Sequence, residues 1–149
     1  MSAIDQDFLR ELADRARAQG AFAEVQVTPR SLRCAAADAA AEAWYSVELK
    51  PEGWFLSLAT PDRWLSESIE ADLMHTGDSL EELFEEELVE FGVEAAPPPI
   101  KHFRSDERLY MFCVRLPDGH NPELVSRYLL AFEATFRSLG DMSGGAEDE

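Results

Sequence analysis

Residues 43–59 have the sequence AWYSVELKPEGWFLSLA, in which two apolar segments flank a turn signal. In the first segment Tyr45, Val47 and Leu49 occupy every second position, and this period of two is typical of a β-strand. Residues 50–53 contain both Pro and Gly, which favour a turn. The apolar run then resumes as WFLSLA, so the whole stretch predicts an antiparallel hairpin.

The next segment, WLSESIEADLM at residues 64–74, shows a similar alternation. Its apolar members share one parity and its polar members share the other: Leu65, Ile69, Ala71 and Leu73 against Ser66, Ser68, Glu70 and Asp72. A strand that buries one face and exposes the other to solvent has this pattern. We therefore predict a third strand here.

Further strands are predicted on both sides of this region. Residues 100–105 and 108–116 are predicted to be two strands joined at Asp106 and Glu107. The second segment, RLYMFCVRL, is apolar on both faces, which indicates a central strand covered on both sides or a strand that pairs with a second subunit. Residues 22–28 predict a short first strand. Residues 31–43 fit either a helix or a flexible connection, because alanine favours helix but offers little apolar surface to anchor one.

Three segments have the 3.6-residue period of amphipathic helices. They cover residues 4–19, 80–91 and 122–139. Asp78 or Ser79 supplies the N-cap of the second helix in a predicted capping box. Asn121 followed by Pro122 is a typical start for the third helix.

Together these patterns predict the α+β class. We expect a single antiparallel sheet of about five strands flanked by three helices, in the order helix, three or four strands, helix, two strands, helix. One domain would cover residues 1–140. Residues 141–149 are Gly-rich and acidic, so they are predicted to be a disordered tail.

The net charge of the chain indicates which classes of partner it can bind. The chain has 30 Asp and Glu against 13 Lys and Arg, a formal net charge of −17. Such a surface repels phosphate backbones and anionic membranes, so we expect no nucleic acid or membrane partner, and basic protein segments are favoured. The alternative is that the charge only maintains solubility. The N-terminus has acidic residues where a signal peptide needs basic ones, and no apolar span reaches 18 residues. We therefore expect a cytoplasmic protein.

No motif for catalysis or ligand binding is found. His75, His102 and His120 are scattered without the spacing of metal ligands, and Cys34 and Cys113 are expected to be free thiols. The signatures of phosphate-binding loops and of serine hydrolases are absent from the sequence. We predict no catalytic, metal or cofactor residues, and no enzyme activity.

Four basic residues gather in the second predicted hairpin: Lys101, Arg104, Arg108 and Arg115. If they share a face, they form a positive patch on a negative molecule. Such a patch would contact acidic groups of a partner, or pair with the Glu-rich helix of the same chain or of a second subunit.

Residues 109–140 (LYMFCVRLPDGHNPELVSRYLLAFEATFRSLG) place an apolar strand before a final helix. With the order of elements, this stretch resembles the class I type III secretion chaperone fold and the related YbjN-like family of bacterial proteins. The resemblance implies a homodimer that holds an extended segment of a partner protein and works as a chaperone or regulator. Trp44, Trp54 and Trp64 are candidate partner-binding residues, because Trp is common among interface anchors. The alternative is an acidic immunity or inhibitor protein that blocks a basic site.

Overall fold

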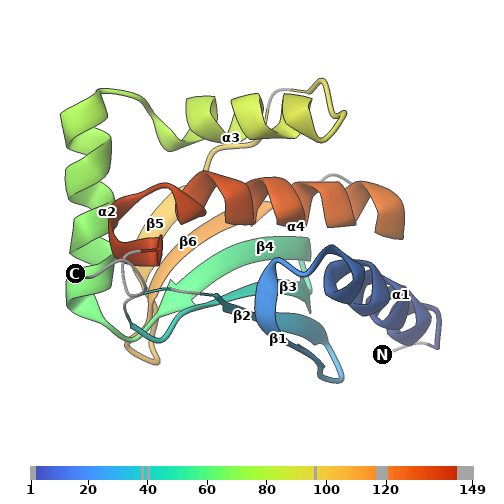
Figure 1. The fold of residues 1–149 in the computed structure, drawn as a ribbon. Coiled ribbons are helices and arrows are strands. Elements are labelled where there is room, and N and C mark those ends of the chain that lie inside the picture. Colours follow the sequence, from blue (N-terminus) through green and yellow to red (C-terminus); the bar gives the residue numbers. More distant parts are fainter. Residues whose placement is uncertain (1–2, 38, 40, 96, 117–120, 144–149) are drawn as a thin grey trace.

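The computed structural model in Figure 1 describes residues 3–37, 39, 41–95, 97–116 and 121–143. Six strands form one antiparallel sheet with the spatial order β1-β2-β3-β4-β6-β5. The strands are β1 (Phe22–Val27), β2 (Ser31–Ala36), β3 (Trp44–Lys50), β4 (Gly53–Thr60), β5 (Lys101–Arg104) and β6 (Tyr110–Arg115). The helices are α1 (Ala3–Gln19), α2 (Arg63–Thr76), α3 (Leu80–Glu90) and α4 (Pro122–Arg137), followed by the 3-10 turn η1 (Gly140–Ser143).

The helices are stacked on one face of the sheet. α1 and α4 pack on the strands, α3 packs on α4 on the side away from the sheet, and α2 stands at one side against η1 (Figure 1). The Phe132 ring of α4 lies 6.3 Å from the ring of Tyr45 in β3 and 5.3 Å from that of Phe84 in α3. These edge-to-face contacts join the three layers into one hydrophobic core.

Most of the predicted elements are confirmed. β3 and β4 form the predicted hairpin, with Lys50 paired to Gly53 at the turn. Ser79 and Glu82 form the capping box of α3, and Asn121 caps α4. The apolar run in β6 is confirmed as an inner strand, because β6 lies between β4 and β5. The expected cover on both faces is not found, since the described helices lie on one face of the sheet. These elements formed where local pattern and tertiary packing agree.

β2 corrects the prediction for residues 31–43. We expected a helix or a flexible connection, yet Ser31–Ala36 is a strand that pairs with β1 on one side and β3 on the other. Leu32 and Cys34 are buried at every second position, while Arg33 between them is exposed. The neighbouring strands accept the backbone hydrogen bonds of this segment, and that tertiary gain outweighs the helix propensity of alanine.

α2 corrects the prediction for residues 64–74, which form a helix rather than a strand. The buried residues Leu65 and Ile69 are four apart, a spacing that fits a period of two and a period of 3.6 equally. The residues at the two ends of the segment distinguish the helix from the strand. The Asp62 carboxylate accepts a hydrogen bond from the Leu65 amide, and Gly77 ends the helix in the left-handed conformation at φ 81°.

The α+β class and the single antiparallel sheet are therefore confirmed, while the counts differ. The described residues form six strands and four α-helices, against the expected five or so strands and three helices. α2 accounts for the additional helix, and β2 takes the place of the strand expected at residues 64–74. Of the predicted tail, residues 141–143 belong to η1, where Met142 is buried. Residues 144–149 lie outside the part of the chain that the structure describes.

Candidate protein-binding surface

One face of the sheet has no helical cover among the described residues, and we call it the open face (Figure 1). Successive side chains of a strand point to opposite faces, so each strand sends one parity into the core and the other to the open face. In β3, for example, Tyr45 is in the core and Trp44 is half-buried outside it. Phe112 and Met111 divide in the same way in β6.

One row of open-face side chains crosses five strands and is apolar throughout. The register pairs Ala35 with Trp44, Trp44 with Ala59, Ala59 with Met111, and Met111 with Phe103. Phe103 is 42% exposed at the β5 edge, although large apolar side chains are usually buried. We call these five residues the apolar row. Ala35, Trp44 and Met111 are half-buried, and Ala59 is buried between its neighbours. Apolar side chains that remain partly exposed next to one another are typical of interaction sites in soluble proteins.

A polar row runs beside it across the same five strands. Its members in register are Arg33, Ser46, Ser57, Cys113 and Lys101. The Ser46 and Ser57 hydroxyls are 2.9 Å apart and hydrogen-bonded. Burial raises the pKa of the Cys113 thiol, which holds it in the unreactive protonated form. The row thus ends in a cation on each side and has small neutral groups between them.

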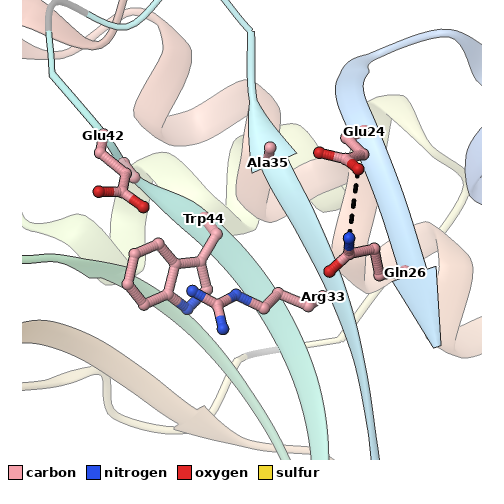
Figure 2. Close-up of a pocket in the computed structure, with 7 residues that line it drawn as sticks. Glu24, Gln26, Arg33, Ala35, Glu42 and Trp44 are labelled. Atoms are coloured by element: carbon pink, nitrogen blue, oxygen red, sulfur yellow. Dashed lines mark hydrogen bonds between the residues drawn. The ribbon is translucent and has the colours of Figure 1, made fainter. Parts of the chain in front are cut away.

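A hollow of about 320 Å³ lies over the open face and includes every member of the apolar row except Ala35 in its lining. A second hollow of about 310 Å³ adjoins it on the β1 side. Figure 2 shows this second hollow, where the Arg33 guanidinium lies 3.9 Å from the centre of the Trp44 ring. Across from them, the Gln26 amide donates a 3.2 Å hydrogen bond to Glu24. Both hollows are walled by side chains of the sheet itself.

The basic residues of the helices and those of the open face differ in their ion pairing. All six helical arginines form ion pairs with a carboxylate three or four residues away: Arg10, Arg15, Arg17, Arg63, Arg127 and Arg137. On the open face, by contrast, Arg33, Lys50, Lys101 and Arg115 have no carboxylate within salt-bridge distance among the described residues. Arg33 and Lys50 lie over aromatic rings instead. The three remaining basic residues, Arg30, Arg104 and Arg108, also form no ion pair within the described residues, so the open face has four of the seven cations without one.

The predicted cluster of basic residues in the second hairpin is split between the two faces of the sheet. Lys101 and Arg115 lie on the open face, and Arg104 stacks at 5.7 Å over Tyr110 on the other. Arg108 lies in the turn with a positive φ of 65°. None of the four pairs with the Glu-rich helix α3 in the described part of the chain, so the pairing within one chain is not formed, while pairing with a second subunit or a partner stays a prediction.

The three candidate Trp residues are not brought together. Trp44 belongs to the apolar row and lines both hollows. Trp54 is 5% exposed and packs in the core, with its ring 4.8 Å from that of Phe8. Trp64 is 75% exposed on α2. Sequence reasoning did not identify Met111 and Phe103, although their register with Trp44 follows once the order of the strands is known.

A polar trio that the sequence did not reveal links α2 to the edge strand β5. His102 Nδ1 lies 2.8 Å from Glu70 Oε2, and His102 Nε2 lies 3.2 Å from Ser66 Oγ. The ring also stacks on Phe112 at 3.9 Å with an interplanar angle of 11°. Burial lowers the pKa of His102, and the nearby Glu70 carboxylate offsets part of that effect.

The trio has the order of a hydrolytic Ser-His-acid arrangement but not its surroundings. Ser66 is 2% exposed, so its hydroxyl is closed to a substrate. Its backbone N–H donates to the Asp62 carbonyl within α2 and cannot stabilise an oxyanion. The trio therefore fastens β5 to α2. His75 is exposed near the end of α2, and His120 lies outside the described residues.

Metal sites and membrane-spanning helices are both absent from the described residues. These residues contain no group of three or more His, Cys, Asp or Glu side chains placed to hold a metal ion. Nor does any of the described helices combine the length and the apolar character needed to cross a bilayer. Cys34 and Cys113 are both free and buried.

Comparison of the chain with protein-family models, with curated proteins and with solved structures finds no match. The class that the structure itself defines is an α+β domain whose antiparallel sheet is covered by helices on one face.

Proposed function

We propose that this chain is a protein-binding module, chaperone-like or regulatory, that holds a segment of a partner protein on the open face of its sheet. The observation that carries this proposal is the apolar row, which crosses five strands on a face without helical cover. Exposed aromatic and Met side chains bordered by polar groups are typical of protein interfaces. The hollow above the row gives a partner side chain space to enter.

The energetics favour the open face over the other exposed apolar sites. Trp64 and Met74 are the most exposed apolar side chains, at 75% and 84%, but they lie apart on α2. A single exposed side chain gains little on binding, whereas adjacent ones exclude water together. We therefore assign the partner to the apolar row.

The test is capture of a partner by the purified chain, compared between two matched variants. In the first variant, Phe103→Ser and Met111→Ser remove two members of the apolar row. In the control, Trp64→Ser and Met74→Ser remove more exposed apolar surface from α2. The first variant should lose affinity about tenfold or more, since roughly 1–2 kcal/mol of apolar burial is removed. The control should capture the same protein as the wild type.

Equal capture by the first variant would refute the proposal, provided that urea unfolding shows it to be folded. If only the control fails to capture the partner, the binding site lies on α2 instead. The homodimer implied by the resemblance is proposed as well, and sedimentation equilibrium tests it against the monomer mass of 16.7 kDa.

A further inference from the structure

We infer that the β5 edge of the sheet pairs with the β5 edge of a second copy of the chain, so that the two apolar rows meet end to end. This inference deepens the proposed function, because it specifies the interface of the proposed homodimer. It follows from the backbone groups of β5, from the register that they allow, and from the exposed side chain of Phe103.

The hydrogen bonds of the sheet show which backbone groups of β5 point outward. The Ser105 amide donates a 2.8 Å hydrogen bond to the Leu109 carbonyl, so this pair is hydrogen-bonded at the end of the ladder between β5 and β6. Hydrogen-bonded and non-hydrogen-bonded pairs alternate along an antiparallel ladder, so His102 and Arg104 direct their N–H and C=O groups away from β6. These four groups have no hydrogen-bond partner among the described residues, and all residues of β5 are exposed.

The other edge of the sheet is partly blocked by α1. The Thr28 amide donates to the Ser31 carbonyl, and the same alternation then directs the backbone groups of Val25 outward on β1. The Val25 carbonyl accepts a 3.2 Å hydrogen bond from the Arg17 guanidinium of α1. A bulge also interrupts the pairing at the start of β1. Covered and bulged edges resist the addition of a strand, so β5 is the edge that can pair.

One register lets two copies of β5 use all four outward groups. An antiparallel pairing that sets His102 of each copy opposite Arg104 of the other forms two hydrogen-bonded pairs around a two-fold axis at Phe103. A shift in one direction sets Ile100 opposite Arg104, but the Ile100 amide already donates to the Glu81 carboxylate. A shift in the other direction sets the two Arg104 side chains opposite each other, and like charges in that position destabilise a strand pair. The β5 edge is therefore complementary to itself in this register.

The side chains are also compatible across the pair. On the open face, the two Phe103 side chains form a non-hydrogen-bonded pair, in which Cα atoms lie about 4.5 Å apart. Phe103 is 42% exposed in the single chain, and the ring of the second copy would cover part of that surface. On the other face, each Arg104 lies opposite a His102 whose ring contacts the Glu70 carboxylate. The cation therefore approaches a carboxylate rather than another cation.

The pairing joins two six-stranded sheets into one. Phe103 is the last member of each apolar row, so the two rows become continuous across the interface. The second copy thus contributes residues to the surface on which we propose that a partner binds. Repulsion between two copies with a net charge of −17 opposes the pairing, and about 0.15 M salt screens it beyond about 8 Å.

The first test is sedimentation equilibrium of the wild type, Arg104→Pro and Arg104→Ala in about 0.15 M salt. Proline at this position removes an amide that no described residue uses, and its ring obstructs an approaching strand. Arg104→Ala removes the same side chain but keeps the amide. The wild type and Arg104→Ala should be dimers of the 16.7 kDa chain. Arg104→Pro should raise the dissociation constant of the dimer about tenfold or more, since the interface loses two hydrogen bonds.

The second test is cysteine cross-linking, which reports the register. In Phe103→Cys the thiols of two copies would lie in the non-hydrogen-bonded pair, at a Cα separation that permits a disulfide. Oxidation with diamide should link this variant into a covalent dimer. Lys101→Cys is the matched control, because Lys101 lies opposite Ser105 of the second copy and its thiols should stay apart. The wild type controls for the native thiols, both of which are buried.

Three results would overturn the inference: a monomeric wild type, a folded Arg104→Pro variant that dimerises like the wild type, or a Lys101→Cys variant that links as readily as Phe103→Cys. If urea unfolding shows that Arg104→Pro does not fold, the cross-linking result decides. Capture of the partner is a separate measurement. A monomeric wild type that captures the partner would overturn only this inference, whereas a dimer whose Phe103→Ser/Met111→Ser variant captures the partner equally well would overturn only the proposed function.

Discussion

At the scale of single residues, His102 is the side chain with the most varied contacts. It faces a carboxylate, a hydroxyl and an aromatic ring, and it lies in an edge strand of only four residues. Edge strands are exposed to unwanted pairing, and tying β5 to α2 through Glu70 and Ser66 limits its movement. The contact is therefore structural, and it keeps Phe103 and Lys101 in place on the opposite face.

A pH dependence follows from the lowered pKa of His102. Because the folded chain binds this proton less readily than the unfolded chain, stability is fully present above the ordinary pKa of 6.5 and is lost as pH falls below it. Urea unfolding of the wild type between pH 8 and pH 5 should show this loss. His102→Gln should have a flatter profile over the same range. Parallel profiles would mean that His102 does not titrate differently in the folded state.

Trp44 and Trp54 show why the sequence could not resolve the candidate site. Both are strand residues in the same hairpin, and the register pairs Leu49 with Trp54. Trp54 is in the core and Trp44 is outside it because the two side chains lie on opposite faces of the hairpin. Trp54 shares its face with Leu56, and Trp44 shares its face with Ser46. The division of the β3 side chains between two faces was predicted correctly. Which face the helices cover, however, is decided only when the helices pack.

At the scale of elements, α2 and η1 form a contact that depends on one glycine. Gly140 has φ 52°, and its amide donates a 2.7 Å hydrogen bond to Asp72. A Cβ atom built on Gly140 would lie 2.6 Å from the Ser68 carbonyl carbon and 2.7 Å from the Ile69 amide nitrogen. These are backbone atoms of a helix and cannot move aside easily.

Gly140→Ala should therefore lower the free energy of unfolding by about 2–4 kcal/mol, through the clash and the left-handed backbone together. Gly77→Ala is the matched control, because φ is 81° and nothing lies within 4 Å of the added carbon. It should cost only about 1 kcal/mol. Chemical denaturation of both variants gives the comparison. Equal losses would show that η1 yields to the added methyl group.

At the scale of the whole molecule, negative charge and apolar contact are segregated. α3 carries six glutamates: Glu81, Glu82, Glu85, Glu86, Glu87 and Glu90. Two of these have structural roles, since Glu82 completes the capping box and Glu81 accepts a 2.8 Å hydrogen bond from the Ile100 amide. The outer layer of the molecule is thus strongly acidic, while four cations without an ion pair among the described residues lie on the opposite, open face: Arg33, Lys50, Lys101 and Arg115.

Removing charge from the outer layer should stabilise the fold. Glu85→Gln/Glu86→Gln removes three like-charge pairs at a spacing of four residues, each of which costs about 0.2–0.5 kcal/mol. We expect a gain of about 1 kcal/mol in urea unfolding at about 10 mM salt. At about 1 M salt the gain should disappear, because screening reduces the Debye length to about 3 Å. A gain that persists at high salt would point to helix propensity instead.

The sequence by itself determined the α+β class, the hairpin of β3 and β4, the ends of α3 and α4, and the acidic surface. These follow from local periods, caps and charge, which short segments carry alone. Tertiary structure decided the rest. β2 is a strand because β1 and β3 supply its hydrogen bonds. The helix α2, by contrast, is marked by local signals at its ends, Asp62 and Gly77, which the prediction from periodicity did not use. The apolar row exists only because the sheet aligns residues from five distant strands, and no local pattern contains that alignment.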